Sequence, residues 1–203
     1  MIYLQNLNKQ FGPKIILKDV NFHLRPNETV GLVGENGMGK TTLFRIITQE
    51  ESVDSGKIVI RKGARVALLK QELGKDDGTI LERVVSGDSH FQSACDEMKR
   101  LEQDLRRPDK SSETKVQRYG ELHHEFERLG GYEREPKARA ILSGLGFHEE
   151  QIKKPLKELS GGWRMRAEMA RLLLQSPDVL LLDEPTNHFD LKSVIWLEAF
   201  LKN

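Results

Sequence analysis

The stretch Gly34-Glu-Asn-Gly-Met-Gly-Lys-Thr41 decides the fold of this 203-residue chain. It fits the pattern G-x-x-x-x-G-K-[ST], in which a glycine-rich loop turns its backbone N–H groups around phosphate oxygens. The run Thr29-Val-Gly-Leu-Val33 before it is rich in β-formers, and residues 41–48 after it have helical spacing. A loop between a strand and a helix is the setting that a phosphate loop needs. We therefore predict a nucleoside triphosphate site, in preference to a chance glycine-rich turn.

The residue types in this loop suit triphosphate chemistry. Gly37 and Gly39 permit the backbone conformations that close the loop, and the following helix adds free N–H donors and its positive dipole end. Lys40 supplies a charge for the β- and γ-phosphates, Thr41 an oxygen ligand for Mg²⁺, and Thr42 a contact to the α-phosphate. The loop residues expected to bind the nucleotide are Gly34, Asn36, Gly37, Gly39, Lys40, Thr41 and Thr42.

A second element, Val179-Leu-Leu-Leu-Asp-Glu184, is an apolar run that ends in two carboxylates. Such a run is typical of a buried parallel strand, and ligands of α/β sheets bind at the carboxyl ends of strands. We expect Asp183 in the Mg²⁺ shell, and Glu184 orienting or deprotonating the attacking water. The alternative is a solvated acidic turn, which a phosphate loop in the same chain disfavours.

The overall composition excludes several classes of protein. The 32 Lys and Arg nearly balance the 31 Asp and Glu, which argues against a globally basic nucleic-acid binder and against a disordered tail. The single cysteine, Cys95, cannot form an internal disulfide. No apolar run is long enough for a membrane span, and the N-terminus lacks the layout of a signal peptide. We expect a soluble, cytoplasmic protein.

The hydrophobic spacing changes along the chain. Short β-runs extend to about residue 72, helical spacing dominates residues 79–155, and α/β order then resumes. We predict a nucleotide-binding core formed by residues 1–78 and 156–203. The predicted helical subdomain at 79–155 contains a helical hairpin at about 88–129, with its turn near Pro108.

A third element, Leu159-Ser-Gly-Gly162, precedes an amphipathic helix that starts with Trp163. Two glycines before a helix make another anion-binding N-terminus. With this element, the phosphate loop and Asp183-Glu-Pro-Thr-Asn-His-Phe-Asp190, the chain resembles an ATP-binding cassette of the ABC-F class, whose members lack membrane domains. Transporter cassettes usually have Gln after the two glycines, so Trp163 and the Glu-Pro-Thr-Asn-His run favour ABC-F. The resemblance spans essentially the whole chain.

The resemblance implies the fold and further roles. The fold is the α/β, P-loop NTPase, ABC-type nucleotide-binding domain with an antiparallel β-subdomain and an inserted helical subdomain carrying an arm. Phe11 is implied to stack on adenine, although a core Phe remains an alternative. Gln71 is implied to sense Mg²⁺ and the attacking water, with an exposed loop Gln as the alternative. The expected catalytic residues are Glu184, Lys40 and Gln71, and the expected Mg²⁺ ligands are Thr41, Gln71 and Asp183.

The resemblance also implies a head-to-tail pair of cassettes with ATP between them. Ser160, Gly161 and Gly162 of one cassette would contact the γ-phosphate held by the other, and Asp190 would cross the interface. ATP would join the pair and hydrolysis would release it.

The sequence departs from ABC-F proteins in two respects. Those proteins usually carry two cassettes in one chain, whereas this chain has one. The strand with the family's switch His is expected after the last helix and is absent, since His188 belongs to the acidic loop. We expect a first cassette truncated before the switch His, which binds ATP better than it hydrolyses it.

The predicted hairpin resembles the ABC-F arm, which in that class reaches into the ribosome. Arg106, Arg107 and Lys110 near its turn are suited to contact rRNA phosphates, with an ordinary solvated helix face as the alternative. The predicted function is ATP binding and, with a partner cassette, ATP hydrolysis by an ATPase acting on the ribosome. The alternatives are the energy subunit of a membrane transporter and a non-hydrolytic, ATP-gated interaction module.

Overall fold

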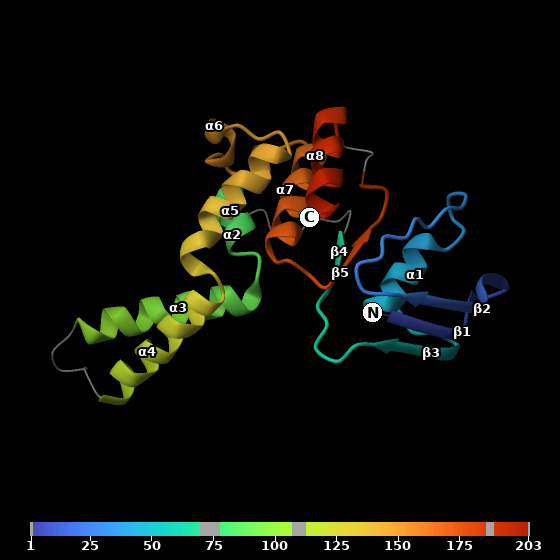
Figure 1. The fold of residues 1–203 in the computed structure, drawn as a ribbon, viewed down its shortest axis with the longest axis horizontal. Helices are drawn as coiled ribbons and strands as arrows, with labels where there is room; N and C mark the ends of the chain where they lie inside the picture. The colour runs from blue at the N-terminus through green and yellow to red at the C-terminus, as the bar shows by residue number, and fades with distance from the viewer. Residues whose placement is uncertain (1, 70–77, 107–112, 186–188, 203) are drawn as a thin grey trace. The chain divides into compact units, whose positions relative to one another are not determined.

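The computed structural model describes residues 2–69, 78–106, 113–185 and 189–202 (Figure 1). The chain forms two compact units. The first comprises Met1–Lys70 and Pro177–Pro185, and the second comprises Gln71–Ser176 and Thr186–Asn203. Each unit is described separately below.

The first unit contains an antiparallel sheet in the order β2-β1-β3. Its strands are β1 (Ile2–Phe11), β2 (Lys14–Leu24) and β3 (Ser55–Ile60). In β1, the register shifts between Leu4 and Leu7, where Asn6 has a positive φ of 47°. This bulge adds one residue to the alternation of faces, so Ile2, Leu4 and Leu7 are all buried.

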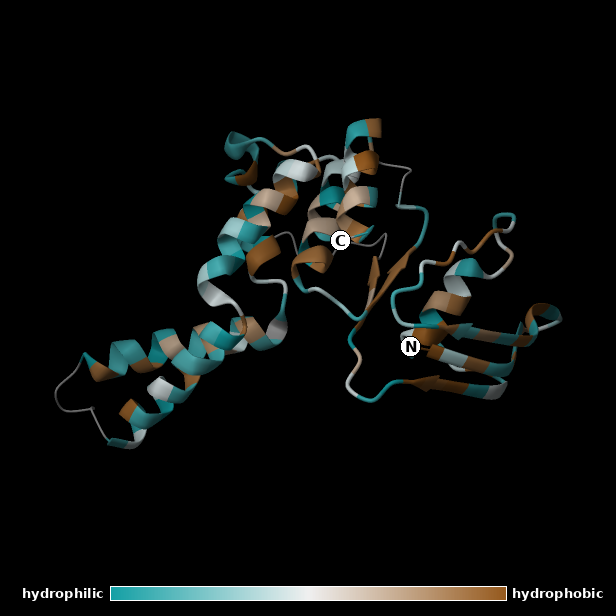
Figure 2. Cartoon of the chain, viewed as in Figure 1, coloured by the Kyte–Doolittle hydropathy of each residue, from teal (hydrophilic) through white to brown (hydrophobic). Residues whose placement is uncertain are grey.

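Helix α1 (Lys40–Ile47) and two further strands complete this unit. Strands β4 (Val66–Leu69) and β5 (Val179–Leu182) pair in parallel, with Val66 opposite Val179, and both are strongly hydrophobic (Figure 2). Residues from α1, β1, β2 and β5 share one hydrophobic core: Ile2, Leu4, Leu7, Leu17, Ile46, Ile47, Val179 and Leu181. The core therefore holds α1, through Ile46 and Ile47 at its end, and β5, the two elements that carry the candidate site.

The prediction of a strand at Thr29–Val33 is wrong. This segment has no regular secondary structure, and Val33 is 95% exposed. β-propensity measures how well side chains fit a pleated, partly buried surface, and a strand forms only where a neighbour accepts its hydrogen bonds. Within the described ranges, no strand pairs with Thr29–Val33, so its β-rich composition leads to an extended loop.

The second unit is helical. It contains α2 (Ile80–Val85), α3 (Ser89–Leu105), α4 (Glu113–Arg128), α5 (Gly131–Gly144), α6 (Glu149–Ile152), a 3₁₀ turn η1 (Leu156–Glu158), α7 (Gly161–Leu174) and α8 (Leu191–Lys202). Helices α2, α5 and α7 pack around buried Val84, Leu142 and Met169. Helices α3 and α4 lie side by side as a hairpin (Figure 1), which agrees with the predicted one.

The base of the hairpin is held by hydrogen bonds from two other helices. The Gly87 carbonyl, one residue before the α3 N-cap, accepts hydrogen bonds from Arg171 Nη1 (2.9 Å) and Gln175 Nε2 (2.6 Å) of α7. A Cβ at Gly87 would lie 2.1 Å from Arg171 Cγ, so a larger residue would have to displace the Arg171 side chain. In α5, Arg134 Nε donates to the Val85 carbonyl at 2.9 Å. None of the described helices is both long and apolar enough to cross a membrane.

Candidate functional site

The phosphate loop of the first unit has the backbone that its glycines predict. Gly37 and Gly39 have left-handed φ values of 79° and 96°, and Gly39 is the N-cap of α1. A Cβ at Gly39 would lie 2.5 Å from Ile16 Cγ2 of β2. Gly39 is therefore required twice, for its conformation and for its close approach to the sheet. The N–H groups at the start of α1 receive no side-chain cap from their N-cap residue within the described structure.

The Lys40 ammonium lies against the loop. Its Nζ donates to the Gly34 carbonyl at 2.6 Å and to the Glu35 carbonyl at 3.0 Å. Lys14 of β2 approaches the same loop, with 3.5 Å between its Nζ and the Gly37 carbonyl. Two cations thus face the loop whose N–H groups would cradle phosphate, and both are held by carbonyl oxygens that an incoming anion can replace.

The end of β5 meets the start of α1. The Thr41 hydroxyl donates to Asp183 Oδ2 at 2.5 Å. A hydroxyl and a carboxylate are both hard oxygen ligands of the kind that Mg²⁺ prefers. The described residues hold no group of three or more His, Cys, Asp or Glu suited to a metal. Mg²⁺ takes few protein ligands and completes its shell with phosphate oxygens and water, so the Thr41 hydroxyl and the Asp183 carboxylate suit it.

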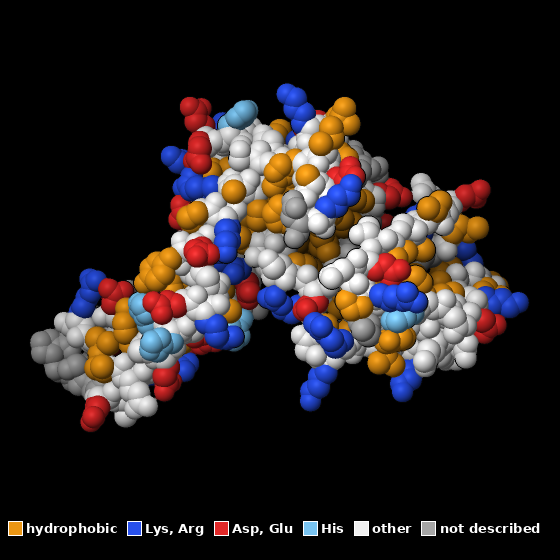
Figure 3. All heavy atoms as spheres, in the orientation of Figure 1, with side chains coloured by type: hydrophobic (Ala, Val, Ile, Leu, Met, Phe, Trp, Pro, Cys, Tyr) orange, Lys and Arg blue, Asp and Glu red, His pale blue; other side chains and the backbone are white. Residues whose placement is uncertain are grey.

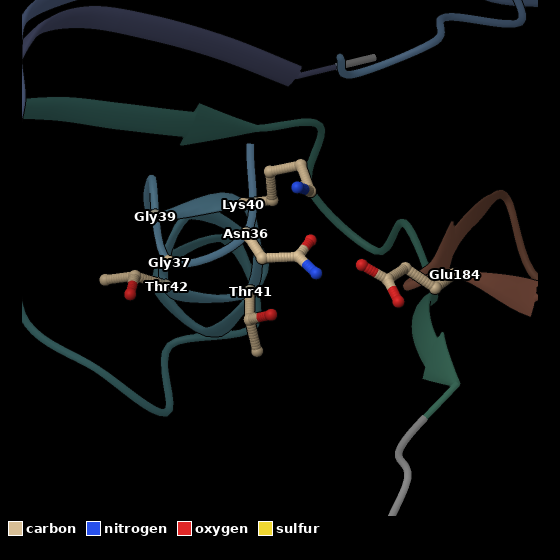
Figure 4. A pocket seen from close by; sticks show the side chains of 7 residues that line it. All are labelled: Asn36, Gly37, Gly39, Lys40, Thr41, Thr42 and Glu184. Carbon is tan, nitrogen blue, oxygen red and sulfur yellow. The ribbon is translucent and has the colours of Figure 1, made fainter. Parts of the chain in front are cut away.

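A cavity of about 230 Å³ lies beside the loop. It is lined by Asn36, Gly37, Gly39, Lys40, Thr41, Thr42 and Glu184. Figure 4 shows the Glu184 carboxylate pointing toward Asn36, while the Thr42 side chain points away from it. Glu184 has a left-handed φ of 48°, which costs a non-glycine residue about 1–2 kcal/mol. Such strain is found where a side chain must be held in a particular direction, here toward the cavity.

Phe11 is the last residue of β1, and its side chain is 48% exposed. The ring is therefore not part of the buried core of the first unit. Lys9 Nζ lies 4.9 Å from the ring centroid and is itself buried, paired with Glu51 Oε1 at 2.7 Å. An exposed ring can stack on a flat base, so the role in adenine stacking stays a prediction for Phe11.

The second unit holds the Ser-Gly-Gly element. Ser160 is the N-cap of α7, and its side chain makes no capping hydrogen bond in the part of the chain that the structure describes. Ser160 and Gly161 are exposed, and a Cβ at Gly161 would meet nothing within 4 Å. This helix N-terminus is open to solvent, with its N–H groups and one hydroxyl available to an anion.

Asp190 is held within its own unit. Its Oδ1 accepts from the Ser193 N–H at 2.9 Å at the start of α8, and its Oδ2 accepts from Arg166 Nη1 at 2.8 Å. The Ser193 N–H and the Arg166 guanidinium lower the pKa of Asp190 to about 2. Sequence reasoning missed Arg166. The available signal was an arginine on the apolar side of α7, between Met165 and Met169.

A sequence model of the family described as "ABC transporter" matches residues 17–187, which include the phosphate loop, the Ser-Gly-Gly element and the acidic strand end. The chain belongs to this family.

Two curated relatives show how much of an ABC protein this chain represents. The "Probable ATP-binding protein YheS" of Haemophilus influenzae is 37% identical over 201 residues, which is 99% of this chain and 30% of the relative. The "ABC transporter F family member 2" of Arabidopsis thaliana is 36% identical over 209 residues, again with 30% of the relative covered and 98% of this chain. The chain spans about a third of the length of these ABC relatives.

Solved ABC structures confirm the predicted fold class. An ATP-binding subunit of an ABC transporter matches with a TM-score of 0.70 at 19% identity, covering 100% of this chain and 73% of that one. A cassette solved as a dimer in a post-hydrolysis state with ADP and Pi matches with a TM-score of 0.68 at 23% identity, covering 99% and 81%. The fold is the α/β, P-loop, ABC-type domain with an antiparallel sheet and helical segments.

Three residues with roles predicted from the sequence lie outside the described residues, namely Gln71, Arg107 and Lys110. Several described cations of the hairpin are paired with acids. Arg106 Nη2 lies 2.6 Å from Glu102 Oε1, and Lys115 Nζ lies 2.6 Å from Asp104 Oδ2. Figure 3 shows acidic and basic side chains interspersed over the hairpin. This balance favours the solvated helix face for the described part of the hairpin.

Proposed function

We propose that this chain binds ATP and Mg²⁺ and forms one half of a composite site, which a second ABC cassette completes for ATP hydrolysis. The observation that carries the proposal is the 2.5 Å contact between Thr41 and Asp183. It joins the phosphate loop to the acidic end of β5, two elements 142 residues apart in sequence. Such a pair of oxygens beside a phosphate cradle suits a Mg²⁺–triphosphate.

In this proposal the first unit holds the nucleotide. The N–H groups of the loop and Lys40 bind the β- and γ-phosphates, and Phe11 stacks on adenine. Thr41, Asp183 and Gln71 provide the positions from which Mg²⁺ would be held, and the bound ion would neutralise charge on the transferred phosphoryl group. Glu184 orients the attacking water and accepts its proton as the water oxygen bonds to the γ-phosphorus, while the bond from that phosphorus to the β–γ bridging oxygen breaks and ADP leaves.

The second unit would act on a nucleotide held elsewhere. The open N-terminus of α7 at Ser160–Gly162 is suited to the γ-phosphate of a partner cassette, because it offers N–H donors and a hydroxyl. Asp190 would face the same partner. The predicted functional core of residues 1–78 and 156–203 thus takes α7 and α8 from the second compact unit, and the helical subdomain at 79–155 supplies most of the rest of that unit.

The test uses the chain with Glu184→Gln, which keeps the shape of the side chain and removes its ability to take a proton. We expect ATP with Mg²⁺ to bind and to promote association, measured by calorimetry and by sedimentation velocity. Glu133→Gln, an exposed acid-to-amide change on α5, is the matched control and should bind ATP and associate as the unaltered chain does. Absence of ATP binding by the unaltered chain would refute the proposal.

We propose further that the complete protein is a cytoplasmic ABC-F ATPase acting on the ribosome. Its support is the similarity to a relative named for the F family, the Trp163 signature and the α3–α4 hairpin. The test is ribosome pelleting by the full-length protein carrying Glu184→Gln, with and without ATP, over a salt series. Absence of ATP-dependent pelleting would contradict this proposal. Co-purification with a membrane protein would then favour a transporter subunit. ATP binding without turnover by the full-length protein would favour a gated interaction module.

A further inference from the structure

A buried arginine lies in the second turn of α7, close to the Ser-Gly-Gly element. Arg166 is 8% exposed, although arginine is almost never buried unless it is paired. Its neighbours Met165 and Ala167 are also buried. Arg166 forms an ion pair with Asp190. Removing Asp190 would leave the buried arginine charge without its partner, which is costly, so the arrangement of groups around Arg166 matters.

Among the described residues, the Arg166 guanidinium contacts groups from α7, from the turn at Leu145 and from the start of α8. Its Nη1 donates to Asp190 Oδ2 at 2.8 Å, with longer contacts of 3.4 Å to the Leu145 carbonyl and to Ser193 Oγ. Its central carbon lies 4.5 Å from the centre of the Trp163 ring, so the planar group lies over the indole. Trp163, which directly follows the Ser-Gly-Gly element, thus packs its ring against the Arg166 guanidinium.

The surroundings leave little room for another arrangement. The Trp163 ring packs edge-on against Phe147, with 4.8 Å between centroids. A Cβ at Gly146 would lie 3.2 Å from Arg166 Nη1 and 3.4 Å from Ser193 Oγ. Ser193 itself is 1% exposed. The guanidinium is therefore closely surrounded, by α7 on one side and by the start of α8 on the other.

We propose that Arg166 is a positioning residue that holds Asp190 in a fixed place relative to the Ser160–Gly162 end of the same helix. The inference rests on the proposed function, in which both groups face a second cassette. Because Arg166 belongs to α7 and binds Asp190 directly, the two groups meet a partner as one preformed surface. Trp163, which replaces the usual transporter Gln, keeps the guanidinium oriented toward Asp190.

The first experiment measures ATP-dependent self-association of the chain in the Glu184→Gln background. Arg166→Lys keeps the charge and loses the planar fork and the stacking, so we expect association to weaken about tenfold. The ATP affinity of the unassociated chain should stay within about twofold, because Arg166 belongs to the second unit and the phosphate loop to the first. Arg171→Lys is the matched control, since it makes the same change in the same helix away from Asp190.

The second experiment is a double-mutant cycle. Asp190→Asn should weaken association by a similar factor, and Arg166→Lys should add little to it. Trp163→Phe, which keeps a ring under the guanidinium, should retain association, whereas Trp163→Gln should weaken it. Rescue by the aromatic residue separates positioning from a general loss of packing.

Each outcome decides the inference. If the parent chain associates with ATP and Arg166→Lys associates equally well, Arg166 does not position Asp190. The inference also fails if Arg166→Lys and Arg171→Lys weaken association to the same degree, because the effect is then general destabilisation of α7. If the parent itself shows no ATP-dependent association, the proposed function fails and the inference fails with it.

Discussion

The two helices that begin at anion-binding motifs, α1 and α7, differ in how complete their N-termini are. Helix α1 begins at a loop with two left-handed glycines, an ammonium against the loop carbonyls, and a hydroxyl bonded to the Asp183 carboxylate. Helix α7 begins at Ser160 with an extended backbone, open space around Gly161 and no capping contact from Ser160 within the described residues. The first can enclose a ligand, whereas the second can only cover one that is held elsewhere.

The largest effect on ATP affinity is expected from a substitution in the phosphate loop at the start of α1. Lys40→Ala removes the ammonium that faces the phosphates, and we expect ATP affinity to fall about a hundredfold, or roughly 2.7 kcal/mol. Calorimetry on the purified chain measures it. Lys57→Ala, an exposed lysine of β3 in the same unit, is the control and should bind ATP normally. Equal loss in both variants would show that net charge, rather than the cradle, attracts the nucleotide.

A matched pair of glycine substitutions tests the difference between the two N-termini directly. Gly39→Ala places a Cβ against Ile16 in a left-handed conformation, so we expect the free energy of unfolding to fall by about 2 kcal/mol. Gly161→Ala places a Cβ in open space and should change it by less than about 0.5 kcal/mol. Urea denaturation gives both values. A reversed order would mean that the loop, not the open helix start, tolerates side chains.

Removal of the Thr41 hydroxyl tests the link between α1 and β5. Thr41→Val keeps the shape and deletes the oxygen that contacts Asp183. We expect Mg²⁺ to strengthen ATP binding about tenfold less in this variant, because one hard oxygen ligand is lost. ATP titrations with Mg²⁺ and with EDTA measure the change. Thr48→Val, at the other end of α1, should keep the full Mg²⁺ effect.

The smallest expected effect concerns Asp190, near the start of α8. Its folded pKa of about 2 lies below the ordinary value of 3.8, so its contribution to stability is complete above that value and is lost as the pH falls through 2. Thermal unfolding of the chain and of Asp190→Asn should therefore differ at pH 5 and converge as the pH is lowered from 4 to 2. A constant difference over this range would show that Arg166 and Ser193 do not hold the ionised carboxylate.

The sequence predicts features that depend on neighbouring residues better than features that depend on contacts with distant segments. The glycine-rich loop and its helix follow from residue types within one short stretch, and the structure has them as predicted. Thr29–Val33 has the composition of a strand but no described neighbour with which to pair, which its own residues cannot reveal. Arg166 was missed for a similar reason, since its partner Asp190 lies 24 residues away on another element. The roles assigned to the site residues stay predictions.

The bonds at the base of the hairpin have a consequence for how the family can diversify. The chain enters the hairpin at Gly87, whose carbonyl accepts hydrogen bonds from Arg171 and Gln175 of α7. It leaves the hairpin at Gly131, where a Cβ would lie 2.2 Å from the Phe126 ring. The hydrogen bonds at Gly87 come from α7, and Gly131 lies against Phe126 near the end of α4, so in the described structure these two contacts do not involve the outer turns of the hairpin. We expect that the α3–α4 hairpin can be lengthened, shortened or exchanged between relatives while the rest of the helical unit keeps its structure.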